Sequence, residues 1–275
     1  MKKISILCFA FVLIATFAKA QDTKIISPDG KLEVTVGVNA GIPVYSVSYN
    51  GKVFLKSSPI GMKTNVGDFS KDLSISEKTS QKSIDETYSL PNIKKSNVHY
   101  QATETVLTFN KAEKSVFDVV FRVSNNDVAF RYKVYPQKDR LSCVVNEETS
   151  GFVFPEGTTT FLCPQSKPMV GFARTMPSYE TGYTPDAPMG KNGNDNNGFT
   201  FPCLFKVGAQ GWVLISETGV DSRYCGSRLI GHEGGLYTIG FPMEGENNGN
   251  GTVSPGIALP GYTPWRTITI GETLQ

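Results

Sequence analysis

The chain has 275 residues, with 27 Lys and Arg against 25 Asp and Glu, which gives a net charge of +2. Because the charge is close to neutral and the basic residues do not cluster, the chain lacks the electrostatic footprint of a nucleic-acid-binding protein. It has two histidines and five cysteines, and no two cysteines form a CxxC pair. A zinc site is therefore not expected.

The first twenty residues have the composition of a secretory signal peptide. Lys2 and Lys3 precede an apolar run over residues 4–17, and Ala18-Lys19-Ala20 supplies small residues where a signal peptidase cuts. The run is too short for a membrane anchor, and Gln21 stands where a lipoprotein would need Cys. We expect cleavage after Ala20, which changes the net charge to −1, and a periplasmic or secreted product with no membrane contact.

In chain order, the mature region shows alternating strand patterns and almost no helical periodicity. Asn50-Gly51, Ser124 to Asp127 and Gly208 to Gly211 separate pairs of such strands, as in β-hairpins. The expected strands cover residues 31–38, 44–49, 52–55, 117–123, 128–134, 199–205, 212–216, 236–241 and 266–270. Residues 67–100 are polar and give no clear assignment. The pattern predicts one all-β domain over residues 21–275, with two packed antiparallel sheets.

A long loop over residues 176–198 is the first candidate for function, because compact sandwiches seldom need a loop of this length. It contains Tyr179, Glu180, Tyr183 and Asp186, followed by a polar run over residues 192–198. That run does not have the Gly and Glu positions of an EF-hand, so a surface turn is the simpler interpretation. A carboxylate beside aromatic rings suits a sugar site or a calcium site.

Other candidates have weaker support. Glu147 and Glu148 are adjacent carboxylates before an apolar turn, and His232 lies in a glycine-rich turn. No G-x-S-x-G elbow and no glycine-rich nucleotide motif accompany them. The four mature cysteines, at positions 143, 163, 203 and 225, fit either one structural disulfide or buried free thiols.

Seven short segments follow one another across the mature chain, at residues 27–32 (SPDGKL), 130–134 (FRYKV), 148–155 (ETSGFVFP), 179–180 (YE), 211–217 (GWVLISE), 224–229 (YCGSRL) and 263–266 (TPWR). Each is short, but their order and spacing together resemble the N-terminal domain of glycoside hydrolase family 97. That family contains α-glucosidases and α-galactosidases of Bacteroidetes.

The resemblance implies a large antiparallel β-supersandwich of the galactose-mutarotase type. In the full enzyme, this domain would pack on a (β/α)₈ barrel that carries the catalytic residues and binds an α-linked oligosaccharide. A calcium ion near the sugar would take one carboxylate from the N-terminal domain and its other ligands from the barrel. Glu180 matches that carboxylate by motif, and Tyr179 and Tyr183 are the expected sugar-contacting residues.

The sequence departs from the family by stopping at Gln275, before the barrel. No catalytic residue can be transferred to it, and we expect the chain alone to be inactive, since a glycosidase needs two carboxyl groups about the scissile bond. Two hypotheses remain open: a truncated part of an exo-acting α-glycosidase, or a stand-alone carbohydrate-binding or scaffold module. Glucoside versus galactoside preference, inversion versus retention, disulfide pairing and oligomeric state are left open.

Overall fold

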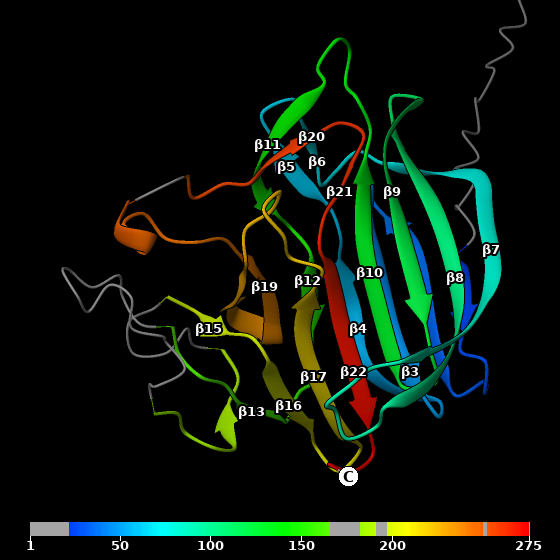
Figure 1. The fold of residues 1–275 in the computed structure, drawn as a ribbon, viewed down its shortest axis with the longest axis vertical. Coiled ribbons are helices and arrows are strands. Elements are labelled where there is room, and N and C mark those ends of the chain that lie inside the picture. Colours follow the sequence, from blue (N-terminus) through cyan, green and yellow to red (C-terminus); the bar gives the residue numbers. More distant parts are fainter. Residues whose placement is uncertain (1–21, 166–181, 191–196, 250–251, 275) are drawn as a thin grey trace, which may run out of the picture.

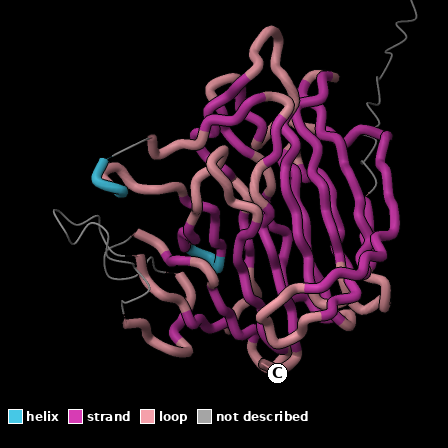
Figure 2. Tube along the Cα trace, viewed as in Figure 1, coloured by secondary structure: helices cyan, strands magenta, loops and turns pink. Residues whose placement is uncertain are grey.

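The computed structural model describes residues 22–165, 182–190, 197–249 and 252–274. Within these ranges every strand pairing is antiparallel, and the helical elements are two short 3₁₀ turns, Glu233–Gly235 and Glu246–Gly249. One ten-stranded sheet stands in front of three smaller sheets, as Figures 1 and 2 show. The prediction of an all-β sandwich is confirmed. None of the described helices is long and apolar enough to span a bilayer.

The large sheet has the order β14-β13-β16-β17-β22-β10-β9-β8-β7, and β21 pairs with β10. Its strands are β7 (Ser74–Ser89), β8 (Asn97–Lys111), β9 (Lys114–Val123), β10 (Asp127–Val134), β13 (Thr158–Phe161), β14 (Ala187–Pro188), β16 (Cys203–Val207), β17 (Gly211–Thr218), β21 (Gly261–Tyr262) and β22 (Trp265–Gly271).

Three four-stranded sheets complete the fold. The first contains β1 (Thr23–Ile26), β2 (Leu32–Asn39), β3 (Ile42–Tyr49) and β4 (Lys52–Pro59). The second has the order β20 (Gly256–Ala258), β11 (Ser142–Glu148), β5 (Met62–Thr64) and β6 (Gly67–Phe69). The third has the order β12 (Gly151–Val153), β19 (Leu236–Gly240), β18 (Arg228–Gly231) and β15 (Phe199–Thr200).

The hairpins follow from the turn residues. Asn50 and Gly51 both have positive φ, 49° and 74°, as a type I′ turn requires, and they join β3 to β4. At the β9–β10 turn, the Ser124 amide donates to the Asp127 carbonyl at 2.8 Å. Alternate residues of β10 are fully buried, so a period of two places one face of each strand in the core.

Aromatic side chains fill the space between the large sheet and the smaller ones. Tyr45 of β3 lies 5.4 Å from Phe130 of β10 between ring centroids, and Tyr237 of β19 lies 5.0 Å from Phe205 of β16. All four rings are essentially inaccessible to solvent. Each buried side chain of this size contributes roughly 1.5–3 kcal/mol, so these contacts hold the layers together.

Two segments differ from the sequence-based expectation. Residues 199–205 form two strands instead of one, because the chain leaves β15 in one sheet and enters β16 in another. Residues 74–111, within and beyond the unassigned polar region, form the longest hairpin, β7–β8. Its outer half lies beyond the β8 residues that pair with β9 and is mostly exposed, so the alternation that marks a half-buried strand is lost there.

Cys143, Cys203 and Cys225 are free thiols. Burial raises the pKa of Cys143 and of Cys203, and it raises the pKa of Cys225 to about 11. These groups behave as small buried apolar side chains, the second of the two alternatives open from the sequence.

Candidate functional site

The described part of the long loop is held against the edge of the large sheet. β14 pairs with β13, and the Thr160 hydroxyl donates to the Ala187 carbonyl at 3.2 Å. The Thr159 hydroxyl donates to the Asp186 carboxylate at 2.5 Å, and Asp186 itself has a positive φ of 56°. This edge therefore fixes the position of the segment that carries Tyr183.

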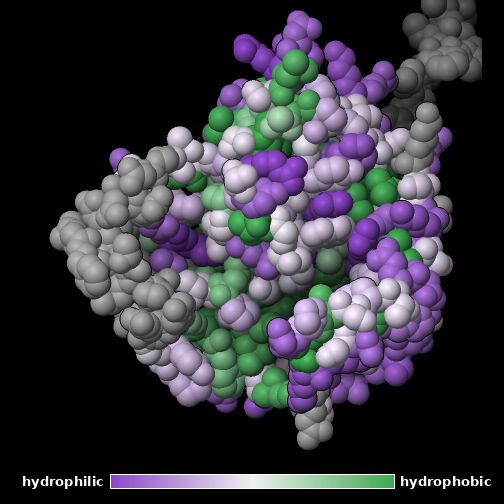
Figure 3. Space-filling view, viewed as in Figure 1, coloured by the Kyte–Doolittle hydropathy of each residue, from purple (hydrophilic) through white to green (hydrophobic). Residues whose placement is uncertain are grey.

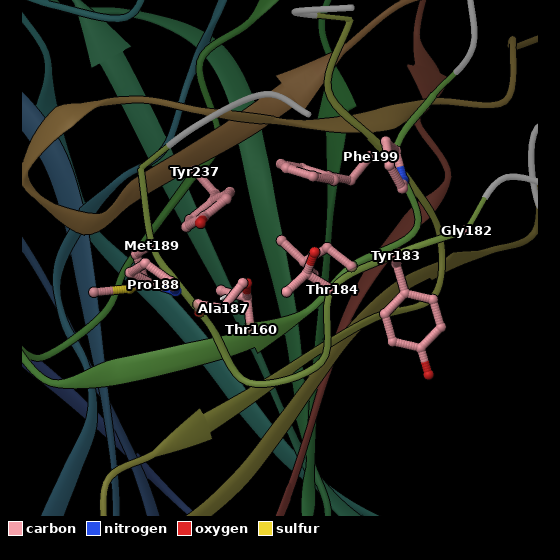
Figure 4. A pocket seen from close by; sticks show the side chains of 11 residues that line it. Thr160, Gly182, Tyr183, Thr184, Ala187, Pro188, Met189, Phe199 and Tyr237 are labelled. Atoms are coloured by element: carbon pink, nitrogen blue, oxygen red, sulfur yellow. Dashed lines mark hydrogen bonds between the residues drawn. The ribbon is translucent and has the colours of Figure 1, made fainter. Parts of the chain in front are cut away.

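A pocket of about 290 Å³ lies under this segment (Figure 4). Its walls come from the loop, from β13 and from the third small sheet. They comprise Thr160, Leu162, Pro164, Gly182, Tyr183, Thr184, Ala187, Pro188, Met189, Phe199 and Tyr237. Tyr183 lies at the rim with 55% of its surface exposed, and its hydroxyl points away from Tyr237. The predicted sugar-contacting residue thus lies at the mouth of a pocket.

The pocket combines apolar walls with a few hydroxyl groups. The Tyr237 hydroxyl accepts a hydrogen bond from the Gly190 amide at 3.3 Å, and burial raises the Tyr237 pKa, which keeps the phenol neutral. Apolar walls with a few fixed polar groups are typical of small-molecule sites. None of the described lining residues is acidic or basic. The pocket can therefore bind a small polar ring, but these residues cannot supply the two carboxyl groups of a glycosidase.

Tyr179 and Glu180, the other two predicted site residues, lie outside the described residues. Among the residues that the structure describes, no three Asp, Glu, His or Cys side chains gather as a metal site would require. Calcium takes six to eight oxygen ligands. A calcium site here would thus need most of its ligands from outside the described ranges.

A second, wider groove of about 560 Å³ shares Pro188 and Met189 with the first pocket. Lys56, Glu156 and Glu233 give it a more polar wall. His232, next to this wall, is exposed and its Nε2 lies 2.7 Å from the Thr238 hydroxyl. No nucleophile accompanies it among these contacts, in agreement with its interpretation as a turn residue.

The adjacent carboxylates Glu147 and Glu148 do not act as a pair. Glu147 is exposed and accepts a hydrogen bond from Lys63 at 2.7 Å, whereas Glu148 is 1% exposed. Successive residues of β11 point to opposite sides of their sheet, so the two side chains are separated. The two residues therefore do not form a carboxylate pair.

Glu148 belongs instead to a polar network centred on the buried Arg266. The Arg266 Nε and Nη2 atoms donate to the two Glu148 oxygens at 2.9 and 2.6 Å. Arg266 Nη1 donates to Glu217 at 2.5 Å and to the Ser227 hydroxyl at 2.8 Å. Arg266 is completely inaccessible to solvent. This bidentate geometry satisfies the charge of a guanidinium that water cannot reach.

Hydroxyl groups extend the network in one direction. The Gly61 amide donates to the Tyr132 hydroxyl at 2.8 Å, and the Tyr132 hydroxyl lies 2.7 Å from the Ser150 hydroxyl. Because the Ser150 hydroxyl donates to Glu148 at 2.9 Å, Tyr132 must be the donor to Ser150. Tyr224 also donates to Glu148, at 3.2 Å. The chain of donors therefore ends on the Glu148 carboxylate.

The electrostatics of the network follow from its burial. Burial opposes the charge on Arg266, but attraction and hydrogen bonding from Glu148, aided by Glu217, raise its pKa above the ordinary value. Burial also raises the pKa of Tyr132 and of Tyr224, with the nearby Glu148 charge acting in the same direction. The guanidinium is charged and both phenols are neutral at any pH near 7.

Comparison with known proteins decides the family. Residues 25–275 match the family model described as the glycosyl-hydrolase 97 N-terminal domain. The chain belongs to the glycosyl-hydrolase 97 N-terminal family. Two curated relatives are a probable retaining alpha-galactosidase of Streptomyces bingchenggensis (strain BCW-1), 28% identical over 89% of this chain, and a retaining alpha-galactosidase of Bacteroides thetaiotaomicron (strain VPI-5482), 26% identical over 85%.

Solved structures agree with this family. A crystal structure of a beta-arabinopyranosidase is 55% identical, with a TM-score of 0.88, and the match covers 93% of this chain and 41% of that one. A family 97 enzyme from Pseudoalteromonas sp. strain K8, in complex with panose, has the same fold, with a TM-score of 0.73 and 22% identity over 91% of this chain and 36% of that one. The chain spans about a third of the length of the curated relatives, 34% in each case.

In this glycosyl-hydrolase 97 N-terminal domain, most of the segments that carry the family resemblance contribute a residue to the network around Arg266. Tyr132, Glu148, Glu217, Ser227 and Arg266 come from five of the short segments singled out in the sequence, and all of them meet in this network. The pocket residues Phe199 and Tyr237 were missed, since a single aromatic residue on a strand has no sequence signal that separates it from the core.

Proposed function

We propose that this chain is the non-catalytic N-terminal β-sandwich of an exo-acting glycosidase. In this proposal it packs on a (β/α)₈ barrel, and the barrel carries the two catalytic carboxyl groups. The observation that supports it best is the 55% identity to a beta-arabinopyranosidase over 93% of this chain. The uncharged lining of the described pocket also supports a binding role without bond cleavage.

The proposed substrate class is a β-L-arabinopyranoside or an α-D-galactoside. The two sugars share their ring configuration from C1 to C4 and differ because the pentose lacks the C6 hydroxymethyl group. Identity to the beta-arabinopyranosidase is about twice the 28% and 26% identity to the alpha-galactosidases, which favours the pentose. Tyr179 and Tyr183 are proposed to contact the sugar at the side of its site formed by this domain.

The first prediction concerns activity. The reading frame downstream of Gln275 is expected to continue into a barrel. Among nitrophenyl glycosides, the longer protein is expected to release nitrophenol fastest from the β-L-arabinopyranoside. The α-D-galactoside should be slower, and the α-D-glucoside slowest, whereas residues 21–275 alone should release none. An authentic stop codon after Gln275, or sugar release by the isolated chain, would contradict the proposal.

The second prediction concerns calcium. We propose that Glu180 supplies one carboxylate to a calcium ion whose other ligands come from the barrel. Isothermal titration of the longer protein should show calcium binding that Glu180→Gln weakens roughly tenfold or more, because ligand charge sets calcium affinity. The control Glu156→Gln removes an exposed carboxylate beside the second groove and should leave the affinity unchanged. Tight calcium binding by residues 21–275 alone would exclude a single-ligand role.

A further inference from the structure

One side of the large sheet carries apolar residues that the described elements cover only in part. On β13, β16 and β17, inward residues such as Phe205 and Ile215 are fully buried against the smaller sheets. The outward residues Phe161, Leu204, Trp212 and Leu214, which we name the outer patch, are half-buried. Phe161, Leu204 and Leu214 lie side by side across the three strands, and the rings of Phe161 and Trp212 are 5.4 Å apart.

Apolar residues on both faces are typical of a sheet that is covered on both sides. A strand that faces water on one side should alternate apolar and polar residues, but β17 carries Trp212, Val213, Leu214 and Ile215 in succession. Figure 3 shows this apolar region as a hollow in the front of the molecule. A contiguous apolar surface that the chain covers only in part is typical of an interaction site.

A row of stacked cations and rings adjoins the outer patch on the same face. The Arg131 guanidinium lies 4.1 Å from the Tyr262 ring centroid and 4.3 Å from that of Trp265. The Arg122 guanidinium, on the neighbouring strand β9, lies 5.2 Å from the centroid of the Trp265 ring. Arg131 Nε is buried without a hydrogen-bond partner. Trp, Tyr and Arg are the residues most enriched at the energetic centres of protein interfaces.

Several basic residues on this face have no carboxylate partner among the described ion pairs. Arg122 is paired with Glu104 at 2.6 Å, but among the described ion pairs Arg131, Lys133 and Lys206 have no carboxylate partner. Lys133 and Lys206 instead lie over the rings of Tyr262 and Trp212. A partner surface that carries carboxylates between apolar residues would complement this face.

The β7–β8 hairpin adds a wall to the face. Its pairing continues to Ser89 and Asn97, and its tip passes in front of the large sheet in Figure 1. Near the tip, Tyr88, Leu90 and Ile93 are 42–47% exposed. A projecting hairpin with apolar residues at its end is not explained by the packing of the described chain. The sheet face and the hairpin together form a groove with an apolar floor.

We propose that this groove is the docking surface for the catalytic part of the enzyme, the partner of the proposed function on which this inference rests. The part of the beta-arabinopyranosidase outside the match is larger than the part inside it, since the match covers 41% of that chain. Strand β22 lies in the middle of the same sheet, and the described chain that follows it, as far as Leu274, leads to the lower edge of the groove. The rest of the enzyme is therefore large enough and near enough to cover the face.

The test uses a chimera in which this chain replaces the matching part of the beta-arabinopyranosidase. Hydroxyl-radical footprinting of the isolated chain and of the chimera measures the solvent access of each side chain. We expect modification of Trp212, Leu214 and Trp265 to fall several-fold in the chimera. Val53, which is exposed on the far side of the first small sheet, is the internal control and should not change.

A second arm uses substitutions on the two faces. Leu204→Glu and Leu214→Lys together, which place opposite charges on directly paired residues, should remove the protection in the chimera, whereas Val53→Glu should preserve it. Because Leu204 and Leu214 are only half-buried in the isolated chain, the pair should lower its unfolding midpoint much less than Ile215→Glu, which changes a fully buried residue of strand β17. An equal fall in the two midpoints would overturn the proposal. Equal modification of Trp212 in chimera and isolated chain would also overturn it.

Two further outcomes distinguish the docking surface from the proposed function on which it rests. A chimera that protects the patch but cleaves no glycoside would contradict the proposed function and support the docking surface. Protection of Trp212 and Trp265 in the isolated chain by an added arabinose- or galactose-containing oligosaccharide would mean that the groove binds sugar, and it would overturn the docking surface.

Discussion

Replacing Arg266 with methionine is expected to lower the free energy of unfolding by about 3–5 kcal/mol. The substitution keeps the length of the side chain but leaves Glu148 and Glu217 without their cation. Glu148 is 1% exposed and Arg266 is fully buried, so water cannot replace the lost hydrogen bonds. Urea unfolding with linear extrapolation measures the change.

The matched control is Arg223→Met, which removes an arginine from an ion pair with Asp221 on the surface. Arg223 is exposed, and exposed pairs contribute little because water solvates both charges. The control should leave the free energy of unfolding unchanged. A loss below about 1 kcal/mol for Arg266→Met, the size expected of an exposed pair, would mean that the network does not stabilise the fold.

A double substitution tests the cause. Arg266→Met combined with Glu148→Leu removes the charge on both sides of the strongest contact, so less uncompensated charge stays buried. Its cost should be smaller than the sum of the two single costs, because residues in direct contact are energetically coupled. Additive costs would show that lost packing, and not the unpaired carboxylate, destabilises the single variant.

Much of the fold is predictable from local chemistry. The β3–β4 and β9–β10 hairpins lie where alternation and turn residues place them, since both signals depend on neighbouring residues. The division of residues 199–205 between two sheets is not predictable in this way. The second half forms the local hairpin β16–β17, whereas the first half pairs with β18, and no local signal in the sequence specifies that pairing.

The site is less predictable than the fold. Tyr183 lies at the rim of a pocket, and an aromatic residue in a long loop is a signal that the sequence alone can supply. Its contact with a sugar stays a prediction. Glu148 and Arg266 are 118 residues apart in the chain, and their contact requires the complete sandwich. Sequence similarity marked both residues, but only the buried geometry shows that they serve the fold.

The second large effect is expected at alkaline pH, where the domain should lose stability steeply above pH 10. Burial raises the pKa of Tyr45, Tyr132 and Tyr224 in the folded chain well above the ordinary value. An unfolded tyrosine ionises near pH 10, so above that pH the folded chain holds protons that the unfolded chain has lost. The stabilising contribution is therefore complete below pH 10 and is lost as pH rises.

Each such group contributes about 1.4 kcal/mol per pH unit, so the three phenols together give a slope of roughly 4 kcal/mol per pH unit. The thiols of Cys143, Cys203 and Cys225, with raised pKa values, add a decline that begins at lower pH, near 8.5. A domain with a total stability of about 5–15 kcal/mol should consequently unfold between about pH 10 and 12. Urea unfolding at a series of pH values under reducing conditions measures the slope.

Tyr45→Phe isolates one of these groups. The Tyr45 hydroxyl donates to the Gly151 carbonyl at 3.0 Å, so the variant loses stability at every pH, but its slope above pH 10 should fall by about 1.4 kcal/mol per unit. Phe121→Leu is the matched control, since Phe121 packs 6.0 Å from the same ring and has no proton to lose. Its stability should fall while its slope stays that of the parent chain. Equal slopes in the two variants would assign the alkaline transition to groups other than the buried phenols.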